Sequence, residues 1–251
     1  LDCAGHAIAG SGRGDGVVVD AASGAELRGC RVSGFRTGIR IRAGSGNRVA
    51  DNEVADNGRY GIELALGTTG NRIEGNAVLR SGDEGIHVGS RADGNHIVAN
   101  QIRDSHTENL YLLDADANEV RANVLSGGGS TGMYIKHSSA NGFADNEVHD
   151  RPVHVRGASV GNHFGGNTLV RSGFVFQAYK DAKLGWTYPH GNEIVGGGVA
   201  GVATCFRFLG AYDNQAVDVI VAGCLPMSVQ PYGGVAARGN DVELAAGSTP
   251  R

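Results

Sequence analysis

Side chains able to carry out chemistry recur at matching positions of short apolar segments in the middle of this 251-residue chain. In a β-strand the second and fourth residues of segments such as GIELA, GIHVG and GMYIK would face inward. The third residue then faces outward, and in five successive segments it is Glu63, His87, Tyr111, Tyr134 and His154. Carboxylates, imidazoles and phenols transfer protons, and aromatic rings stack on sugars. This outward strip therefore predicts a surface that binds or transforms a saccharide.

Two cations lie beside the strip, at the fifth position of their segments. Lys136 follows Tyr134 by two residues, and Arg156 follows His154 in the same way. Cations next to a phenol and an imidazole suit an anionic substrate. Arg156 would neutralise a carboxylate, Lys136 or His154 would remove a proton, and Tyr134 would donate one. The alternative interpretation is an ordinary polar ladder on a strand surface.

Further contacts with a long substrate are expected along the same surface. Besides Glu63, His87 and Tyr111, the residues that would extend it are Arg40, Arg42, Gln177 and Arg207. An insertion near residues 178–191, AYKDAKLGWTYPHG, follows one segment directly and carries Lys180, Trp186 and Tyr188. Its aromatic rings would wall one side of the strip and stack on sugar rings. Trp186 could equally cap an apolar patch on the body of the protein.

Glu84 and Glu108 each come just before one of the apolar segments, in adjacent copies. Strands in a sheet lie about 4.8 Å apart, so stacked segments would bring the two carboxylates close together. Such a pair would bind a hard cation such as Ca²⁺, or share a proton so that one pKa is raised. Two solvated carboxylates that point apart are the alternative.

The segments belong to a repeat that organises most of the chain. Each copy starts with an Asn and an apolar residue two positions later, and repeats that pattern five residues on. The starting residues are Asn47, Asn71, Asn95, Asn118, Asn141 and Asn162, at spacings of 24, 24, 23, 23 and 21 residues. A period in this range, with strands and no helical pattern, predicts an all-β, single-stranded parallel β-helix of roughly ten coils, forming one domain over residues 1–251.

The recurring asparagines are interpreted as structural rather than sugar-binding. Asn tolerates left-handed turn geometry, and stacked amide side chains can hydrogen-bond from coil to coil. The four cysteines form two candidate pairs, Cys3 with Cys30 and Cys205 with Cys224, each about one coil apart. Each pair either forms a disulfide, as is usual in an exported protein, or consists of two buried thiols in the core. The sequence does not decide between these alternatives.

The composition limits the partners. A formal charge of −4 and a pI near 6.1 argue against nucleic acid or an anionic membrane as the main partner. No apolar run approaches the roughly 18 residues that a membrane span needs. The chain begins at Leu1, in the middle of a repeat pattern, so we expect a processed or trimmed product of a secreted or periplasmic protein.

The N-x-[IV] turns and G-I-x-V strands between Asn47 and Arg156, with the opening LDCAGHAI, resemble the right-handed parallel β-helix superfamily. That superfamily includes pectate and alginate lyases, chondroitinase B, mannuronan C5-epimerases, many glycosidases and periplasmic proteins of nitrous-oxide reductase maturation. Lys136 and Arg156 resemble the Lys base and the Arg that the alginate lyase and chondroitinase B group places on neighbouring coils. The Ca²⁺-binding glutamates of that group have no equivalent in residues 127–131, so a Ca²⁺ role would shift to Glu84 and Glu108. The Asp-Pro-His motif of the epimerases is absent.

The leading hypothesis is an enzyme that acts on an acidic, uronate-containing polysaccharide or oligosaccharide by abstracting the proton next to the carboxylate. Elimination would make it a lyase, and reprotonation from the opposite face would make it a C5-epimerase. One alternative is a non-catalytic β-helix that serves as a binding or assembly module, such as a periplasmic maturation protein or an adhesin. Another is a glycoside hydrolase that uses Glu63 with Glu84 or Glu108 as paired carboxylates.

Overall fold

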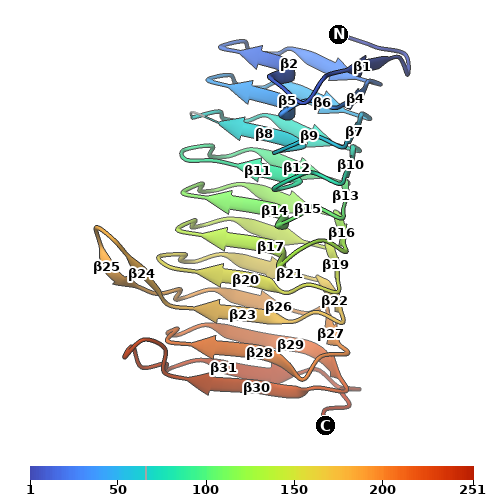
Figure 1. Ribbon diagram of the computed structural model, residues 1–251. Coiled ribbons are helices and arrows are strands. Elements are labelled where there is room, and N and C mark those ends of the chain that lie inside the picture. The colour runs from blue at the N-terminus through green and yellow to red at the C-terminus, as the bar shows by residue number, and fades with distance from the viewer. Residues whose placement is uncertain (66) are drawn as a thin grey trace.

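The structure, a computed structural model, describes residues 1–65 and 67–251 and is an all-β solenoid. Its coils stack from the N-terminal end to the C-terminal end, with each coil contributing one strand to a long front sheet (Figure 1). That sheet has ten strands, which confirms the parallel β-helix of about ten coils predicted from the repeat. In the described ranges, no helix is long and apolar enough to cross a membrane.

The front sheet is entirely parallel and carries the outward strip. Its strands in order are β2 (Asp15–Asp20), β5 (Thr37–Arg42), β8 (Ile62–Ala65), β11 (Ile86–Val88), β14 (Glu108–Leu113), β17 (Thr131–Lys136), β20 (Val153–Arg156), β23 (Phe174–Gln177), β28 (Thr204–Leu209) and β30 (Leu225–Gln230).

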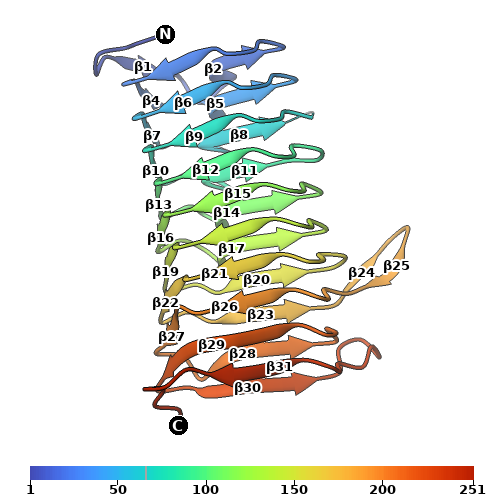
Figure 2. The same cartoon turned by 180° about the vertical axis from the view of Figure 1, so that it is seen from behind.

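Two further parallel ladders complete each coil and meet at a shared strand, β29 (Gln215–Ala222), as seen from behind in Figure 2. The first contains β3 (Glu26–Arg28), β6 (Arg48–Ala50), β9 (Arg72–Glu74), β12 (His96–Val98), β15 (Glu119–Arg121), β18 (Gly142–Ala144), β21 (His163–Gly165), β26 (Glu193–Val195) and β31 (Asp241–Leu244). The second contains β1 (Ala7–Ala9), β4 (Arg31–Ser33), β7 (Glu53–Ala55), β10 (Ala77–Leu79), β13 (Gln101–Arg103), β16 (Val124–Ser126), β19 (Glu147–His149), β22 (Thr168–Val170) and β27 (Gly198–Ala200).

The recurring asparagines form two buried ladders at the turns, as the structural interpretation predicted. Asn123 is typical: its side-chain oxygen accepts hydrogen bonds from the backbone N (2.9 Å) and Nδ2 (3.0 Å) of Asn100. Its own Nδ2 donates to the oxygen of Ile97 at 2.8 Å and to Oδ1 of Asn146 at 3.0 Å. Each side chain therefore satisfies turn amides that water cannot reach, and fixes the register of one coil on the next.

Between the sheets lies a continuous apolar core that holds the strands rigid. Inward residues of the front sheet, such as Ile86 and Leu110, are fully buried. Towards the C-terminal end the aliphatic stack gives way to stacked rings, including Phe174 on Phe206 at 5.5 Å between centroids. Side chains on the outer face of these strands are therefore presented by a scaffold that does not depend on them.

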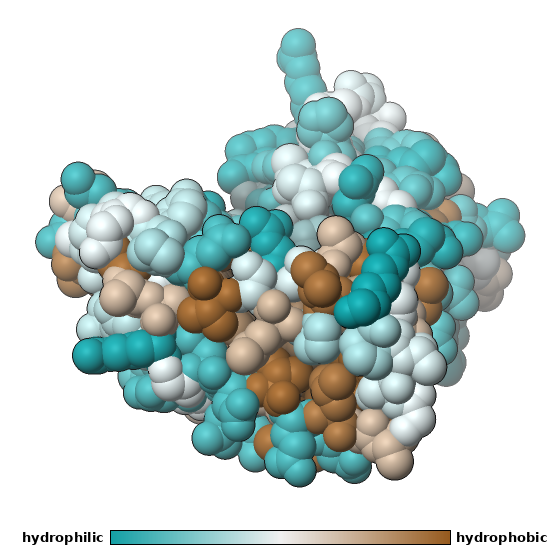
Figure 3. Space-filling model, turned by 90° about the horizontal axis from the view of Figure 1, so that it is seen from below, coloured by the Kyte–Doolittle hydropathy of each residue, from teal (hydrophilic) through white to brown (hydrophobic). Residues whose placement is uncertain are grey.

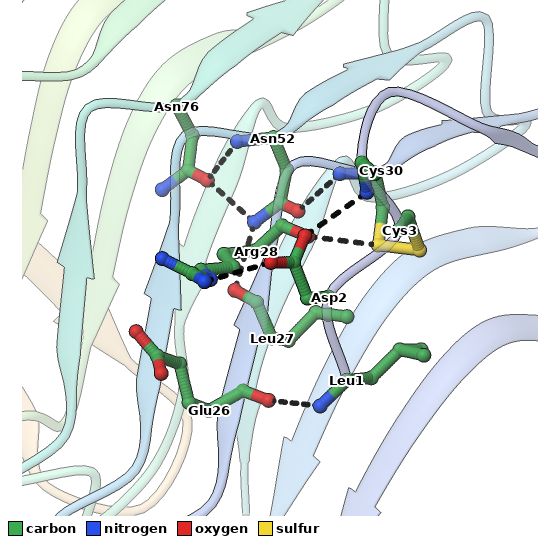
Figure 4. The surroundings of a disulfide bond; sticks show 10 residues. Leu1, Asp2, Cys3, Glu26, Leu27, Arg28, Cys30, Asn52 and Asn76 are labelled. Carbon is green, nitrogen blue, oxygen red and sulfur yellow. Dashed lines mark hydrogen bonds and ion pairs between the residues drawn. A yellow bond between two sulfur atoms is a disulfide. The ribbon is translucent and has the colours of Figure 1, made fainter.

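Both candidate cysteine pairs are disulfides in the structure. Cys3 bonds to Cys30 near the N-terminus, where Asp2 pairs with Arg28 at 2.7 Å, as Figure 4 shows. The second bond joins Cys205 to Cys224, both fully buried in the C-terminal coils. Two disulfides are typical of proteins that fold in an oxidising compartment.

Two features depart from the regular stack. The insertion forms a hairpin of β24 (Tyr179–Asp181) and β25 (Gly185–Thr187) that projects from the body beside β23 (Figure 1). At the C-terminal end, no described coil covers the inward residues Met227 and Val229 of β30, which are each 42% exposed. Apolar side chains are correspondingly visible among the polar surface at this end of the molecule (Figure 3).

Candidate functional site

The register of the front sheet places the outward strip as the repeat alignment predicted. Successive strands pair Arg40 with Glu63, Glu63 with His87, and His87 with Tyr111. The strip then continues through the pairs that link Tyr111, Tyr134, His154, Val175 and Arg207. Neighbouring rings are in contact: Tyr111 stacks on Tyr134 at 5.0 Å, and Tyr134 lies 5.1 Å from His154.

Lys136 and Arg156 are opposite each other on β17 and β20, and form what we call the cation cluster with Tyr134 and Tyr179. Nη1 of Arg156 donates a hydrogen bond to the Tyr134 hydroxyl at 3.0 Å. Lys136 Nζ lies 4.2 Å, and Arg156 Cζ 4.8 Å, from the centre of the Tyr179 ring. Within the described residues, neither cation forms an ion pair with an acidic side chain, although Asp181 is near enough for the charge of Lys136 to help lower its pKa.

The two acid–base candidates next to these cations are electrically neutral at pH 7. Burial, reinforced by the nearby charge of Arg156, lowers the pKa of His154 to about 4. Burial also raises the pKa of Tyr134, although the Arg156 guanidinium opposes that rise. His154 can therefore accept a proton at neutral pH, and Tyr134 holds a proton that it can donate.

The burial of His154 predicts a pH-dependent stability. In the unfolded chain this imidazole takes up a proton near pH 6.5, whereas in the folded protein it does so only near pH 4. The unfolded state therefore binds more protons between these values, and the free energy of unfolding should fall by about 3 kcal/mol as the pH drops through this window. Urea unfolding of the wild type and His154→Gln at several pH values measures the difference. His106→Gln, at an exposed histidine, should leave the pH profile unchanged, and an unaltered profile in His154→Gln would contradict the argument.

A second group of titratable side chains occupies the coils on the N-terminal side of the cation cluster. Glu84 and His87 are only 7% and 9% exposed, and Glu84 Oε1 lies 3.8 Å from His87 Nδ1. The His87 ring stacks on Tyr60 at 4.5 Å. Glu108, one coil further on, accepts a hydrogen bond from Ser130 Oγ at 3.1 Å, and burial raises its pKa. The negative charge of Glu84 contributes to that rise, so the two predicted carboxylates are near enough to interact.

The predicted contacts at the N-terminal end of the strip are engaged in ion pairs. Arg40 bonds to Asp15 and to Glu63, both at 2.6 Å. Arg42 pairs with Asp20, which lies directly opposite it in the sheet. These residues lie several strands away from the cation cluster, and their charges are already balanced within the protein.

The hairpin side chains that were predicted to contact a sugar differ in their surroundings. Trp186 is 36% exposed and packs against Tyr232 and the backbone of Gly233, where a Cβ would lie only 1.9 Å from the indole. Tyr188 packs edge-on against Tyr212, and Lys180 is exposed to solvent. Trp186 thus anchors the hairpin on the C-terminal coils, while Tyr179 at its base contacts the cation cluster.

A pocket of about 390 Å³ opens at the edge of β20, β23 and β28. Arg207 is one of the residues that line this pocket. Gln177 lies on β23, two residues after Val175, and is directly opposite Arg156 in the sheet. Gln177 is therefore next to the cation cluster, whereas Arg207 lies two strands beyond β20, opposite Val175.

Two residues of this surface were not among the predicted site residues. Tyr179 lies in the insertion, where no repeat register tells which way a side chain points. Tyr60 stacks on His87 but comes two residues before its strand, outside the aligned positions. Tyr60 occupies the same position before its strand as Glu84 and Glu108 do in the next two coils. That shared position is the signal in the sequence that could have identified Tyr60.

Comparison with known proteins supports the fold. Residues 3–201 match the model of the family described as "Periplasmic copper-binding protein (NosD)". No curated protein matches the chain. Among solved structures, the periplasmic alginate epimerase AlgG (T265N mutant) is 18% identical with a TM-score of 0.63, covering 92% of this chain and 50% of its own. The A-module of the mannuronan C-5 epimerase AlgE4 from Azotobacter vinelandii is 14% identical with a TM-score of 0.60, covering 90% and 63%. The chain thus spans about half to three-fifths of these structures, and identities this low concern the fold alone.

The family description raises the question of whether this chain could hold copper. All four cysteines form disulfides, and Met133 is 1% exposed within the core. Over residues 1–65 and 67–251, no three His, Cys, Asp or Glu side chains come together as a metal-binding group. With all four cysteines in disulfides, the described residues offer no thiolate to a copper ion, and the other methionine, Met227, is 42% exposed at the C-terminal end.

Proposed function

The chain belongs to the NosD family, a family of right-handed parallel β-helices, and from the cation cluster on its front sheet we propose that it is an exported protein acting on a uronate-containing polysaccharide. The observation that carries the proposal is the arrangement of Lys136 and Arg156. Two adjacent cations, held on the Tyr179 ring without an acidic partner among the described residues, suit a carboxylate supplied by a substrate. The similarity in fold to alginate and mannuronan epimerases, and the two disulfides, support the substrate class and the export.

The proposed reaction begins with the substrate carboxylate between the two cations. Their charges stabilise the enolate that forms when the proton on the adjacent ring carbon is removed. His154 accepts that proton, with Lys136 as the alternative acceptor. If Tyr134 then protonates the same carbon from the opposite face, the product is the C5 epimer. If Tyr134 instead protonates the departing glycosidic oxygen while the bond to the neighbouring ring carbon breaks, the product is an unsaturated uronate.

Ca²⁺ at Glu84 and Glu108 forms part of the proposal. Two carboxylates would supply some of the six to eight oxygen ligands that Ca²⁺ takes, and substrate or solvent oxygens would supply the others. The pair lies two or three strands from His154 along the front sheet, so a bound cation would hold a neighbouring saccharide unit rather than the reacting one.

The test is incubation with alginate, pectate and glycosaminoglycans. A lyase increases the ultraviolet absorbance through the new double bond, and an epimerase changes the uronate composition seen by NMR without cleavage. The proposal is wrong if no polymer shows either change while the protein is folded.

The other function is a non-catalytic binding or assembly module, which the resemblance of the sequence to periplasmic maturation proteins implies and the periplasmic description of the matching family supports. Such a module would bind its partner without a chemical change. Replacement of Lys136 and His154 would leave that binding intact, and this outcome separates the two functions.

A further inference from the structure

The pocket of about 390 Å³ on the C-terminal side of His154 is built from three successive coils. Pro152 comes from the coil of β20, Val175 lies on β23, and Val202 and Ala203 precede β28. These four residues give the pocket an apolar surface, and all of them are at least partly exposed to solvent. Its volume lies within the range of about 300 to 1,000 Å³ that is usual for small-ligand sites.

The polar residues of the pocket include a single uncompensated charge. Asp150 and Arg171 form an ion pair at 2.6 Å, so their charges cancel. Arg207 is exposed, and across the described ranges it forms no ion pair. An apolar surface next to one available guanidinium fits a ligand that has both a hydrophobic face and an anionic group, because the guanidinium can hold a carboxylate through two hydrogen bonds.

The pocket lies in line with His154, which pairs with Tyr134 of the cation cluster. Val175 pairs directly with His154, and Arg207 pairs directly with Val175. Neighbouring strands are about 4.8 Å apart, so the Arg207 strand is roughly 10 Å from the His154 strand. Arg207 is near enough for its charge to contribute to the lowered pKa of His154. A saccharide chain that runs across the strands from the cation cluster would therefore reach the pocket with a unit close to the reacting one.

We infer that this pocket is a binding subsite for a second acidic saccharide unit of the same chain. The carboxylate of that unit binds Arg207, and the C–H face of its ring packs on Val175 and Val202. The inference rests on the proposed function, and adds to it the place where a second unit of the polysaccharide binds. The binding energy gained at the pocket holds the reacting unit in place between Lys136 and Arg156.

Calorimetric titration with saturated oligouronates of increasing length tests the subsite without requiring turnover. Arg207→Ala removes the cation, and Ala203→Trp fills the pocket from an exposed position without disturbing the core. In both variants the dissociation constant for oligomers long enough to span both sites should rise roughly tenfold or more, as expected for a lost charge-assisted hydrogen bond or a blocked site. The shortest oligomer that binds the wild type should bind both variants with unchanged affinity.

Arg103→Ala is the matched control, because it removes an exposed cation from β13, outside the front sheet. It should bind oligomers of every length like the wild type. If Arg207→Ala and Ala203→Trp also bind long oligomers like the wild type, the subsite is refuted and the proposed function stands. If the folded wild type binds no oligouronate, the proposed function and the subsite are both refuted.

Discussion

Arg156→Gln is expected to lower kcat on a uronate polymer by roughly 100- to 1,000-fold, the usual effect of removing one preorganised donor to a developing negative charge. Arg156 is suited to that role because it is held on the Tyr179 ring at 4.8 Å and donates to Tyr134 at 3.0 Å. Glutamine keeps a polar side chain but loses the positive charge. Initial rates from the absorbance or NMR assay measure the effect.

The fold of Arg156→Gln should remain intact, because the side chain is on the outer face of β20 and the core below it is unchanged. Arg103→Gln, on the separate ladder that contains β13, should retain wild-type kcat and so exclude a general effect of net charge. A kcat within a few-fold of the wild type for Arg156→Gln would remove Arg156 from the proposed chemistry.

Asn123→Ala should reduce the free energy of unfolding by about 2 to 4 kcal/mol, because it removes several buried hydrogen bonds at once. The backbone N and Nδ2 of Asn100 lose their acceptor, and the oxygen of Ile97 loses a donor. All three residues lie in the buried interior of the stack, where no water replaces the missing partner. Equilibrium unfolding in urea measures the change, with the m-value checked for two-state behaviour.

The control for this prediction is Asn240→Ala, at the end of the same kind of ladder. Asn240 is only half-buried, and it accepts from Asn214 and donates to the oxygen of Ala211. Water can replace its hydrogen bonds, so the loss should be clearly smaller than at Asn123. Equal losses at the two positions would show that burial of the ladder does not determine its contribution.

The sequence predicted the fold and the outward strip because both follow from one strict repeat. Strand residues alternate between the two faces, and stacking in register converts sequence alignment into spatial neighbours. That is why the alignment of the repeats was enough to place Tyr134, Lys136, His154 and Arg156 together. The same alignment sets Asp20 opposite Arg42, so their ion pair was also open to prediction.

What the sequence did not predict depends on directions that no repeat fixes. Tyr179 belongs to the hairpin, and its contact with Lys136 depends on how that hairpin leaves the coil. The Tyr60 ring, which stacks on His87 and contributes to its burial, lies outside the aligned strand positions. The pocket beside Arg207 depends on the shape of three turns together, and turn conformation varies with every residue in them.

The hairpin also bears on how such a protein can change during evolution. The coil that carries it takes 30 residues between Asn162 and Asn192, against 21 between Asn146 and Asn167, and yet both pairs of amides bond alike. A longer segment is therefore accommodated at one corner without altering the register of the coils on either side. In such a scaffold, a corner loop can be lengthened or exchanged to give a new substrate preference. The Asn ladders that hold the coils together need not change when the loop does.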